Sequence, residues 1–477
     1  MFQLPQSIPL KFTNSNGKWV SILSPNDGSL LTTIQEATED DIDFLLSETQ
    51  QIQQSLAQLR PFQRADILKS VVNDIRNQHE FLSWVIAREG GKPIKDARIE
   101  VTRAAATLEL CAEETLRLVG EVIPMERTSA GKDHLAFTMR DPIGAVLAIS
   151  AFNHPLNLIA HQVGCAIASG CSVVLKPAPS TPLSAHFLQE AFKKAGLPEG
   201  AIRVVHAEIP TIQKLASSSE FDFVSFIGSD KVGWELQKRL APGTRLFLEH
   251  GGQAQAIVRE DADLEAAVHA LTKGAFYHAG QVCISTQVIF IHEKIFSPFL
   301  SLFKKATEKL ILGSATEEST DVGPLIRPSE VLRIQSWIND ALKAGAELVT
   351  GNIVSGHSAQ FLSPTILANV PSNCSIMTEE AFGPVVCVNT YQDEEELLSD
   401  INQRDYIFEA SLFTQDITKA LSIAQKMSAM TLVINNHTAF RVDQMPFGGH
   451  KKSGLGMGGV KYAIESMTRI KQIIMKI

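Results

Sequence analysis

The feature that most constrains the fold is an alternation of short β-branched runs with helical segments between residues 143 and 249. The runs IGAVLAIS, SVVLK, DFVSFIG and RLFLE are separated by stretches of helical periodicity that begin near Asn157, Leu183 and Lys231. Parallel strands need a crossover connection, and a helix usually supplies it, so this order predicts a parallel, doubly wound sheet with helices on both faces. Ligands of such sheets bind beyond the carboxyl ends of the strands.

The rest of the chain divides around this region. Apolar runs such as QVIFIHE and TLVINN, with helices near residues 264–277 and 331–344, predict a second α/β domain. The first hundred or so residues are interpreted as helical, with a capping signal at Thr38 and Asp41, a helix from Pro61 to Gly90 and another over about 95–118. The β-prone segments 134–140 and RIKQIIMKI are expected to form a small sheet that pairs with another subunit.

Charge and hydropathy exclude several classes of partner. The 477 residues carry a formal net charge of -9 and a pI near 5.8, whereas nucleic acids and anionic lipids attract basic surfaces. No stretch approaches the roughly 20 apolar residues that span a bilayer, and the N-terminus lacks a basic segment before an apolar run. We therefore expect a cytoplasmic protein with a small-molecule partner and with neither nucleic-acid nor membrane partners.

The six cysteines contain no CxxC pair and no zinc-type spacing with histidine, which argues against both a disulfide framework and a metal site. Most are expected to be small buried apolar side chains. Cys283 differs, because it follows Gly280, Gln281 and Val282 in the run HAGQVCIST, which is not a helical core pattern.

Polar and glycine residues stand at the carboxyl ends of three predicted strands. Asn153 in FNHP can direct its amide at a bound carbonyl oxygen, although a turn residue is the commoner role for such an asparagine. Lys176 in LKPAPSTP can reach a ribose or a phosphate, or can be an exposed strand-end lysine. In FIGSDKVG, Gly228 and Gly233 flank a strand-to-helix turn, and Ser229 begins a helix whose free N–H groups suit a pyrophosphate.

A fourth cluster combines a carboxylate with a thiol. Glu249 ends the strand in LEHGGQ, and Cys283 lies in the later turn GQVC. A thiol nucleophile needs a base that accepts its proton and later activates water, so these two residue types indicate nucleophilic catalysis. A solvated surface charge is the alternative interpretation of Glu249.

Together these segments resemble the aldehyde dehydrogenase superfamily over essentially the whole chain. The resemblance depends on seven motifs in order: FNHP, KPAPSTP, FIGSDKVG, LEHGG, GQVC, EEAFGPV and PFGGHKKSG. Each motif is moderately specific, and the ordered set is very specific. The resemblance implies an α/β fold with a Rossmann-type cofactor domain (residues 1–118 and 141–249), an α/β catalytic domain (250–445) and a small β oligomerisation extension (119–140 and 446–477) that makes a homodimer or homotetramer.

The resemblance also implies a mechanism, in which Cys283 attacks the aldehyde, hydride leaves to NAD or NADP, and the resulting thioester is hydrolysed by water that Glu249 activates. Asn153 would hold the oxyanion together with the Cys283 backbone N–H. The residues expected to contact the cofactor are Lys176, Ser229, Gly228, Gly233, Glu380, Phe382, Ser150 and Phe152. Pro179 occupies a position where members that prefer NAD often carry an acid, so NADP remains an option.

Three residues are candidates for contact with the substrate: His154, Arg103 and Arg441. Two arginines can clamp a carboxylate, which suggests a semialdehyde such as succinic semialdehyde or a small hydroxyaldehyde such as lactaldehyde. Ordinary ion pairs or loop contacts are the alternative roles of these arginines. Two other functions stay open, a CoA-acylating dehydrogenase and a non-catalytic cofactor-binding protein, although Glu249 favours hydrolysis and Cys283 and Asn153 favour an active enzyme.

Overall fold

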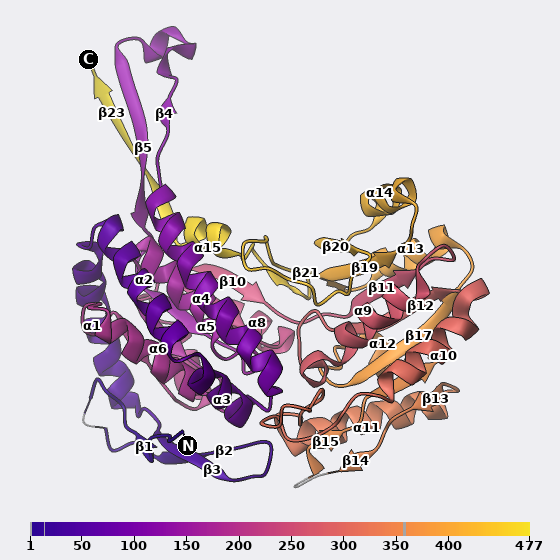
Figure 1. Cartoon of the computed structure of the whole chain (residues 1–477). Coiled ribbons are helices and arrows are strands. Elements are labelled where there is room, and N and C mark those ends of the chain that lie inside the picture. The colour runs from indigo at the N-terminus through magenta and orange to yellow at the C-terminus, as the bar shows by residue number, and fades with distance from the viewer. Residues whose placement is uncertain (1, 14, 356–358) are drawn as a thin grey trace.

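The structure is a computed structural model that describes residues 2–13, 15–355 and 359–477. Two α/β bodies lie side by side, and a narrow arm projects from the first of them (Figure 1). The first body contains a six-stranded sheet of order β22-β10-β9-β6-β7-β8, and the second a seven-stranded sheet of order β13-β16-β17-β12-β11-β19-β20. The predicted α/β class, with parallel sheets in both halves, is confirmed.

The first sheet follows the predicted alternation of strands and helices. Its parallel strands are β6 (Val146–Ile149), β7 (Val173–Lys176), β8 (Ile202–Val204), β9 (Phe223–Ile227) and β10 (Arg245–Glu249). The helices between them are α5 (Asn157–Ser169), α6 (Leu183–Lys194), α7 (Ile209–Ala216) and α8 (Asp230–Gln237). Every residue of β6 and β9 is buried, as expected for strands covered on both faces.

The N-terminal region departs from the prediction in two ways. A three-stranded sheet of β1 (Ser7–Ile8), β2 (Trp19–Leu23) and β3 (Leu30–Gln35) stands where helix was expected. The turn NDG between β2 and β3, with Gly28 at φ +71°, is a hairpin signal flanked by β-branched residues. The helix expected from Pro61 to Gly90 is interrupted at Gln78, whose φ of -103° and ψ of 17° are not helical.

The helices of this region otherwise lie where they are expected. They are α1 (Glu39–Ala57), α2 (Pro61–Asn77), α3 (His79–Gly90) and α4 (Ile94–Arg117). Thr38 caps α1 by accepting a hydrogen bond from the backbone N–H of Asp41, whose carboxylate accepts one from the Thr38 backbone, so the predicted capping signal is present.

The second body repeats the strand and helix alternation. Its strands are β11 (Ala254–Val258), β12 (Thr286–His292), β13 (Glu347–Thr350), β16 (Thr365–Ala368), β17 (Val385–Tyr391), β19 (Glu409–Phe413) and β20 (Thr431–Ile434). The longer helices are α9 (Leu264–Phe276), α10 (Phe296–Thr307), α11 (Pro328–Lys343), α13 (Glu394–Gln403) and α14 (Ile417–Lys426). All strands are parallel except β13.

The arm is a separate antiparallel sheet formed by β23 (Thr468–Lys476), β5 (His134–Pro142) and β4 (Val122–Ile123). The two β-prone segments therefore pair with each other, as expected. Residues 446–467, which the prediction assigned to the extension, lie elsewhere: β22 (Gly454–Leu455) pairs with β10, and α15 (Val460–Ser466) packs against α4 and α5. The apolar side chains Val460 and Ile464 are buried there. The division into domains stays a prediction.

Among the described residues, no helix combines the length and the apolar character that crossing a membrane requires.

A buried ion pair joins the start of α4 to the start of α5. Lys92 is completely buried, and its ammonium donates to Glu100. The other carboxylate oxygen of Glu100 accepts from the backbone N–H groups of Leu156, at 2.9 Å, and Asn157, at 3.2 Å. Glu100 therefore holds the segment that follows FNHP, and Lys92 compensates its charge.

We expect Lys92→Met to destabilise the protein by about 3 kcal/mol, because it leaves the Glu100 carboxylate buried without its counter-charge. The measurement is the midpoint of thermal unfolding. Lys95→Met is the matched control, since the Lys95–Asp321 pair is partly exposed and should contribute little. Equal midpoints for the two variants would contradict the expectation.

Candidate active site

A cavity of about 930 Å3 is lined by residues of both bodies. All the predicted site residues line it except Gly233; they are Arg103, Ser150, Phe152, Asn153, His154, Lys176, Gly228, Ser229, Glu249, Cys283, Glu380, Phe382 and Arg441. The carboxyl ends of β6, β7, β9 and β10 lead into this space, which is where the sheet topology predicts a ligand. Gly233 lies on α8, where an added Cβ would meet the His250 ring at 1.9 Å, so a glycine here permits close packing against that ring.

Cys283 is presented by a strained turn between α9 and β12. His278, Ala279 and Gly280 all have positive φ, of 49°, 55° and 69°. A Cβ at Gly280 would lie 2.1 Å from the carbonyl oxygen of Gly383, so only glycine fits this close approach. Positive φ at two non-glycine residues is rare and costs free energy, and such strain is typical of functional sites.

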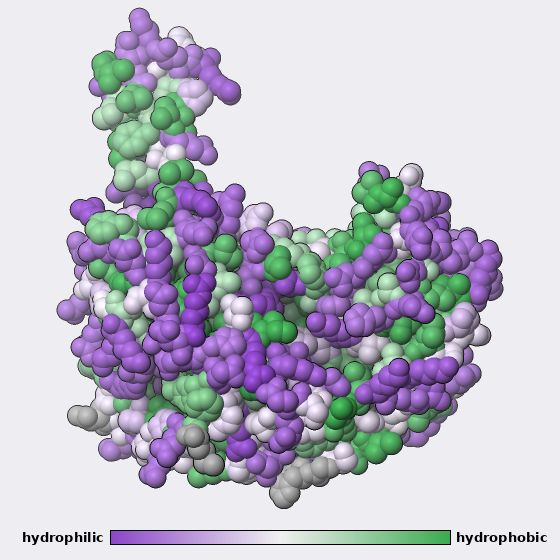
Figure 2. All heavy atoms as spheres, in the orientation of Figure 1, coloured by the Kyte–Doolittle hydropathy of each residue, from purple (hydrophilic) through white to green (hydrophobic). Residues whose placement is uncertain are grey.

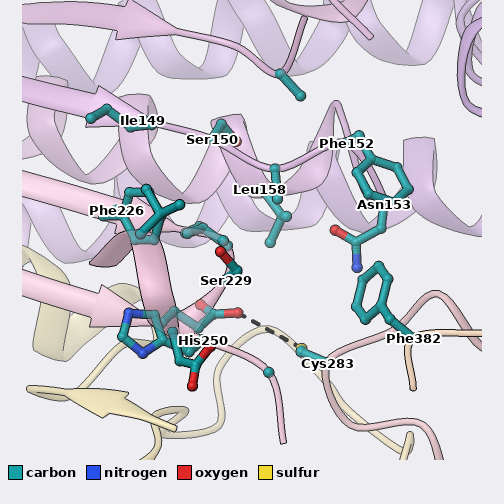
Figure 3. Close-up of a pocket in the computed structure, with 18 of the residues that line it drawn as sticks. Ile149, Ser150, Phe152, Asn153, Leu158, Phe226, Ser229, His250, Cys283 and Phe382 are labelled. Carbon is teal, nitrogen blue, oxygen red and sulfur yellow. Dashed lines mark hydrogen bonds between the residues drawn. The ribbon is translucent and has the colours of Figure 1, made fainter. Parts of the chain in front are cut away.

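The Cys283 thiol faces Glu249 across the cavity. Its sulfur donates to Glu249 Oε1 at 3.9 Å, which is the dashed contact in Figure 3. Burial raises the pKa of the Cys283 thiol well above its usual range, and the neighbouring Glu249 raises it further. Burial also raises the pKa of Glu249, which the Arg441 guanidinium partly opposes. The thiol is therefore neutral, and the carboxylate beside it is a stronger base than an exposed glutamate would be.

Asn153 approaches the same space from the opposite wall, just after β6 (Figure 3). It is 4% exposed, and its side-chain amide has no hydrogen-bond partner among the described residues. An unpartnered amide donor beside a nucleophile can stabilise a developing oxyanion.

The other end of the cavity contains unsatisfied polar groups at strand and helix ends. Ser229 caps α8 without using its hydroxyl for a cap hydrogen bond, and the first residues of this helix line the cavity. Lys176 ends β7, and its burial without an ion pair among the described residues lowers its pKa to about 8. Helix N–H groups and a lysine suit phosphate and ribose oxygens.

Four more of the predicted residues line the same cavity: Glu380, Ser150, Phe152 and Phe382. Glu380 is half-buried, its Oε1 is shielded from solvent without a hydrogen-bond partner among the described residues, and desolvation raises its pKa to about 8. The Ser150 hydroxyl is likewise buried and unpartnered. The rings of Phe152 and Phe382 meet edge to face at 5.7 Å (Figure 3). These orphaned groups and the flanking rings fit a dinucleotide that spans the cavity and supplies the missing partners.

The two candidate arginines are placed differently. Arg103 forms a bidentate pair with Asp443, through Nε at 3.1 Å and Nη2 at 2.8 Å. Asp443 is buried and also contacts Asn157 and His161. Burial raises the pKa of its carboxyl, but hydrogen bonds and charge from His161 and Arg103 outweigh it and hold that pKa well below the usual range. Arg103 is thus largely neutralised where it lines the cavity.

Arg441 has no carboxylate within ion-pair distance among the described residues. Its guanidinium lies 3.5 Å from the centre of the Phe447 ring, and its buried Nε has no hydrogen-bond partner. Burial lowers its pKa, while Glu249 raises it. A half-buried cation that lacks a paired anion among the described residues favours binding of an anionic ligand.

Comparisons with known proteins agree with this geometry. The model of the "Aldehyde dehydrogenase family" matches residues 12–473. The chain is 37% identical over 469 residues to a 3-sulfolactaldehyde dehydrogenase of Priestia aryabhattai, with 97% of each chain covered. It superposes with a TM-score of 0.95 and 34% identity on aldehyde dehydrogenase 21 of Physcomitrella patens, solved with the reaction product succinate, covering 99% of this chain and 98% of that one.

The chain belongs to the aldehyde dehydrogenase family. A second solved structure, a glyceraldehyde-3-phosphate dehydrogenase of Methanocaldococcus jannaschii complexed with NADP, has a TM-score of 0.92 and 34% identity and covers 97% of this chain and 100% of that one. The resemblance seen in the motifs is therefore confirmed, as is the activity at the level of the family: oxidation of an aldehyde with NAD or NADP.

Sequence reasoning missed several residues of this aldehyde dehydrogenase site. Asp443 was not singled out, although it stands two positions after Arg441 in RVDQMPFGG. Tyr277, which lines the cavity beside His154, and the buried Glu409 were also missed. Asp443 could have been found from the sequence, because it is a carboxylate two positions from a candidate arginine. Glu409 could not, because nothing in the strand run EASLF distinguishes it as a site residue.

We expect Glu249→Gln to shift the reaction of Cys283 with iodoacetamide to lower pH. The Glu249 carboxylate raises the pKa of Cys283, so its removal should increase the thiolate fraction at a given pH. The measurement is the alkylation rate against pH, followed by intact mass. Glu330→Gln, at the rim of the same cavity, is the control. A shift to higher pH in Glu249→Gln would show that Glu249 promotes ionisation of the thiol in the resting protein.

Proposed function

We propose that this aldehyde dehydrogenase oxidises a small aldehyde with an anionic group at its far end, such as a semialdehyde or an acidic hydroxyaldehyde related to lactaldehyde. The observation that carries the proposal is the unpaired Arg441 guanidinium in the same cavity as Cys283 and Glu249. A substrate anion would supply the partner that Arg441 lacks, and Arg103 with Asp443 would form the adjacent wall.

In this proposal Cys283 is the nucleophile. Glu249 accepts the thiol proton, and the sulfur adds to the carbonyl carbon of the aldehyde. The resulting oxyanion accepts hydrogen bonds from the Asn153 amide and the Cys283 backbone N–H, which stabilise its charge in a cavity of low polarity. His154, next to Asn153, lines the cavity and would contact the carbon atoms beyond the carbonyl.

The second half of the reaction releases the acid. When bound, NAD or NADP accepts the hydride, which leaves the acyl group as a thioester on the Cys283 sulfur. Glu249 must first release to solvent the proton that it took from the thiol. It then takes a proton from water, whose oxygen attacks the thioester carbon, and the Cys283 thiolate departs as the carboxylic acid forms. The raised pKa of Glu249 makes it a stronger base for this step than an exposed glutamate would be.

The groups proposed to hold the cofactor are those left unsatisfied by the protein itself. Lys176 would bind the adenosine ribose, Ser229 and the first turn of α8 the pyrophosphate, and Glu380 the nicotinamide ribose. Gly228, Ser150, Phe152 and Phe382 would line its path. No acid stands at Pro179 to repel a 2'-phosphate, and both cofactors are therefore proposed.

Two names among the relatives support an anionic substrate. One relative is a 3-sulfolactaldehyde dehydrogenase, and the product solved in the Physcomitrella patens protein is succinate. Both molecules carry a negative group remote from the reacting carbon. Hydrolysis is favoured over transfer to CoA, because Glu249 lies beside the thiol where a water-activating base is needed.

We expect Arg441→Met to raise KM for succinic semialdehyde about 30-fold or more, since loss of a buried charged partner costs at least about 2 kcal/mol. KM for butanal, which has no charge, should stay unchanged. The assay follows NADH and NADPH formation with and without CoA. Arg327→Met, at the exposed rim, is the matched control, and Cys283→Ala should be inactive.

Two outcomes would contradict the proposal. Equal activity in Cys283→Ala would overturn the thioester mechanism. An unchanged KM for succinic semialdehyde in Arg441→Met would keep the mechanism and overturn the anion site.

We also propose that the arm joins copies of the chain into a homodimer or homotetramer. Figure 2 shows apolar side chains along the projecting arm. The exposed ones include Leu135, Met139, Ile470, Ile474 and Met475. A strand edge with exposed apolar residues tends to be covered by another chain.

The double variant Ile470→Lys with Ile474→Lys should therefore have a lower mass in light scattering than the wild type. Both side chains are more than half exposed in the single chain, so the change should not affect folding. Ile417→Lys, on the exposed face of α14, is the control. A wild-type protein that is already monomeric would contradict this proposal.

A further inference from the structure

Glu409 is a buried carboxyl group for which the proposed mechanism has no use. It is the first residue of β19, it is 3% exposed, and neither carboxylate oxygen has a hydrogen-bond partner among the described residues. Burying such a group without partners is costly. A function at this position would explain why the cost is tolerated.

The sheet register places Glu409 beneath the loop that presents Arg441. Ala410 pairs with Gln255, so Glu409 lies beside Ala254, and Ala254 pairs with Thr286 on the next strand. Side chains level with one another on neighbouring strands project from the same face. On that face the Thr286 hydroxyl bonds to Thr438 at 2.8 Å, and Thr438 lies three residues before Arg441 in the covering loop.

The charged groups that act on Glu409 are Arg441 and Glu249. Burial and the Glu249 carboxylate raise the pKa of Glu409 to about 8, while Arg441 opposes the rise. The Cys283 thiol is the third titratable group in reach, and its pKa is in turn raised by Glu409. The Arg441 guanidinium thus lowers the pKa of both Glu249 and Glu409, and neither carboxylate forms an ion pair with it.

We propose that Glu409 determines the affinity of this site for anionic aldehydes: protonated, it leaves Arg441 free to bind the substrate anion, and ionised, it competes with the substrate for that guanidinium. The inference rests on the proposed function, because it assumes that the substrate anion binds at Arg441. It adds a specificity-determining residue that does not line the cavity itself.

The proposal fixes the sign of a pH dependence. A bound anion repels ionised Glu409 and so raises its pKa further. Below the pKa of about 8 the carboxyl is already protonated, and affinity is independent of pH. Above it, binding requires uptake of one proton, and affinity falls by up to tenfold for each pH unit.

The experiment is calorimetric titration of the full chain with succinate, a carboxylate that cannot react, from about pH 6.5 to about pH 9.5. For the wild type we expect a constant Kd up to about pH 8 and roughly tenfold weaker binding at the top of the range. Glu409→Gln should bind succinate with a Kd that does not change with pH. Glu409→Leu also cannot titrate, so its Kd for succinate should likewise be independent of pH. It provides the same test if Glu409→Gln does not fold. Glu235→Gln, an exposed carboxyl at the far end of the cavity, should retain the wild-type profile.

The failures are distinguishable. A wild-type Kd that weakens with pH and keeps the same slope in both Glu409 variants overturns the role of Glu409 and leaves the Arg441 site intact. A wild-type Kd for succinate that does not change between these pH values also overturns the role of Glu409 and leaves the Arg441 site intact. Absence of succinate binding at every pH, in wild type and in Arg441→Met alike, overturns the anion site of the proposed function and this inference with it.

Discussion

The buried carboxylate of Asp443 connects the parts on which the site depends. It accepts hydrogen bonds from Arg103 on α4 and from Asn157 and His161 on α5, and it lies in the loop that carries Arg441 from the second body. Charge-assisted bonds of this kind are strong and directional. One carboxylate therefore sets how the helices behind Asn153 and the loop with Arg441 meet. It also pairs with Arg103, so that of the two candidate arginines Arg441 is the one without an ion pair among the described residues.

Burial is the second factor that shapes the chemistry. It raises the pKa of the Cys283 thiol and of the carboxyl groups of Glu249, Glu380 and Glu409, and it lowers the pKa of Lys176. Desolvation disfavours each charged form, so the acids and bases of the cavity are closer to neutral than they would be in water. Ligand groups that replace the missing partners then change the protonation of the site, which couples binding to proton transfer.

The sequence predicted the helix starts and strand ends that depend on interactions between residues near one another in the chain. The capping box at Thr38 and the β-branched runs before Asn153 and Lys176 describe their own backbone, and the structure has a helix start and strand ends there. The three N-terminal strands and the break at Gln78 were missed, although the turn around Gly28 contained a usable signal. The placement of β22 and α15 on the first body was also missed, because pairing over such a separation in sequence leaves no local pattern.

The sequence by itself determined the family, the α/β alternation and the residue types of the chemistry, since ordered motifs at strand ends and hydrophobic periodicity are both properties of the linear chain. Only the tertiary structure decided which of two arginines is paired, that the Cys283 thiol lies 3.9 Å from Glu249, and that Glu409 is buried near Arg441 without a partner. The physical reason is that electrostatic environment depends on distance and solvent access between residues far apart in sequence.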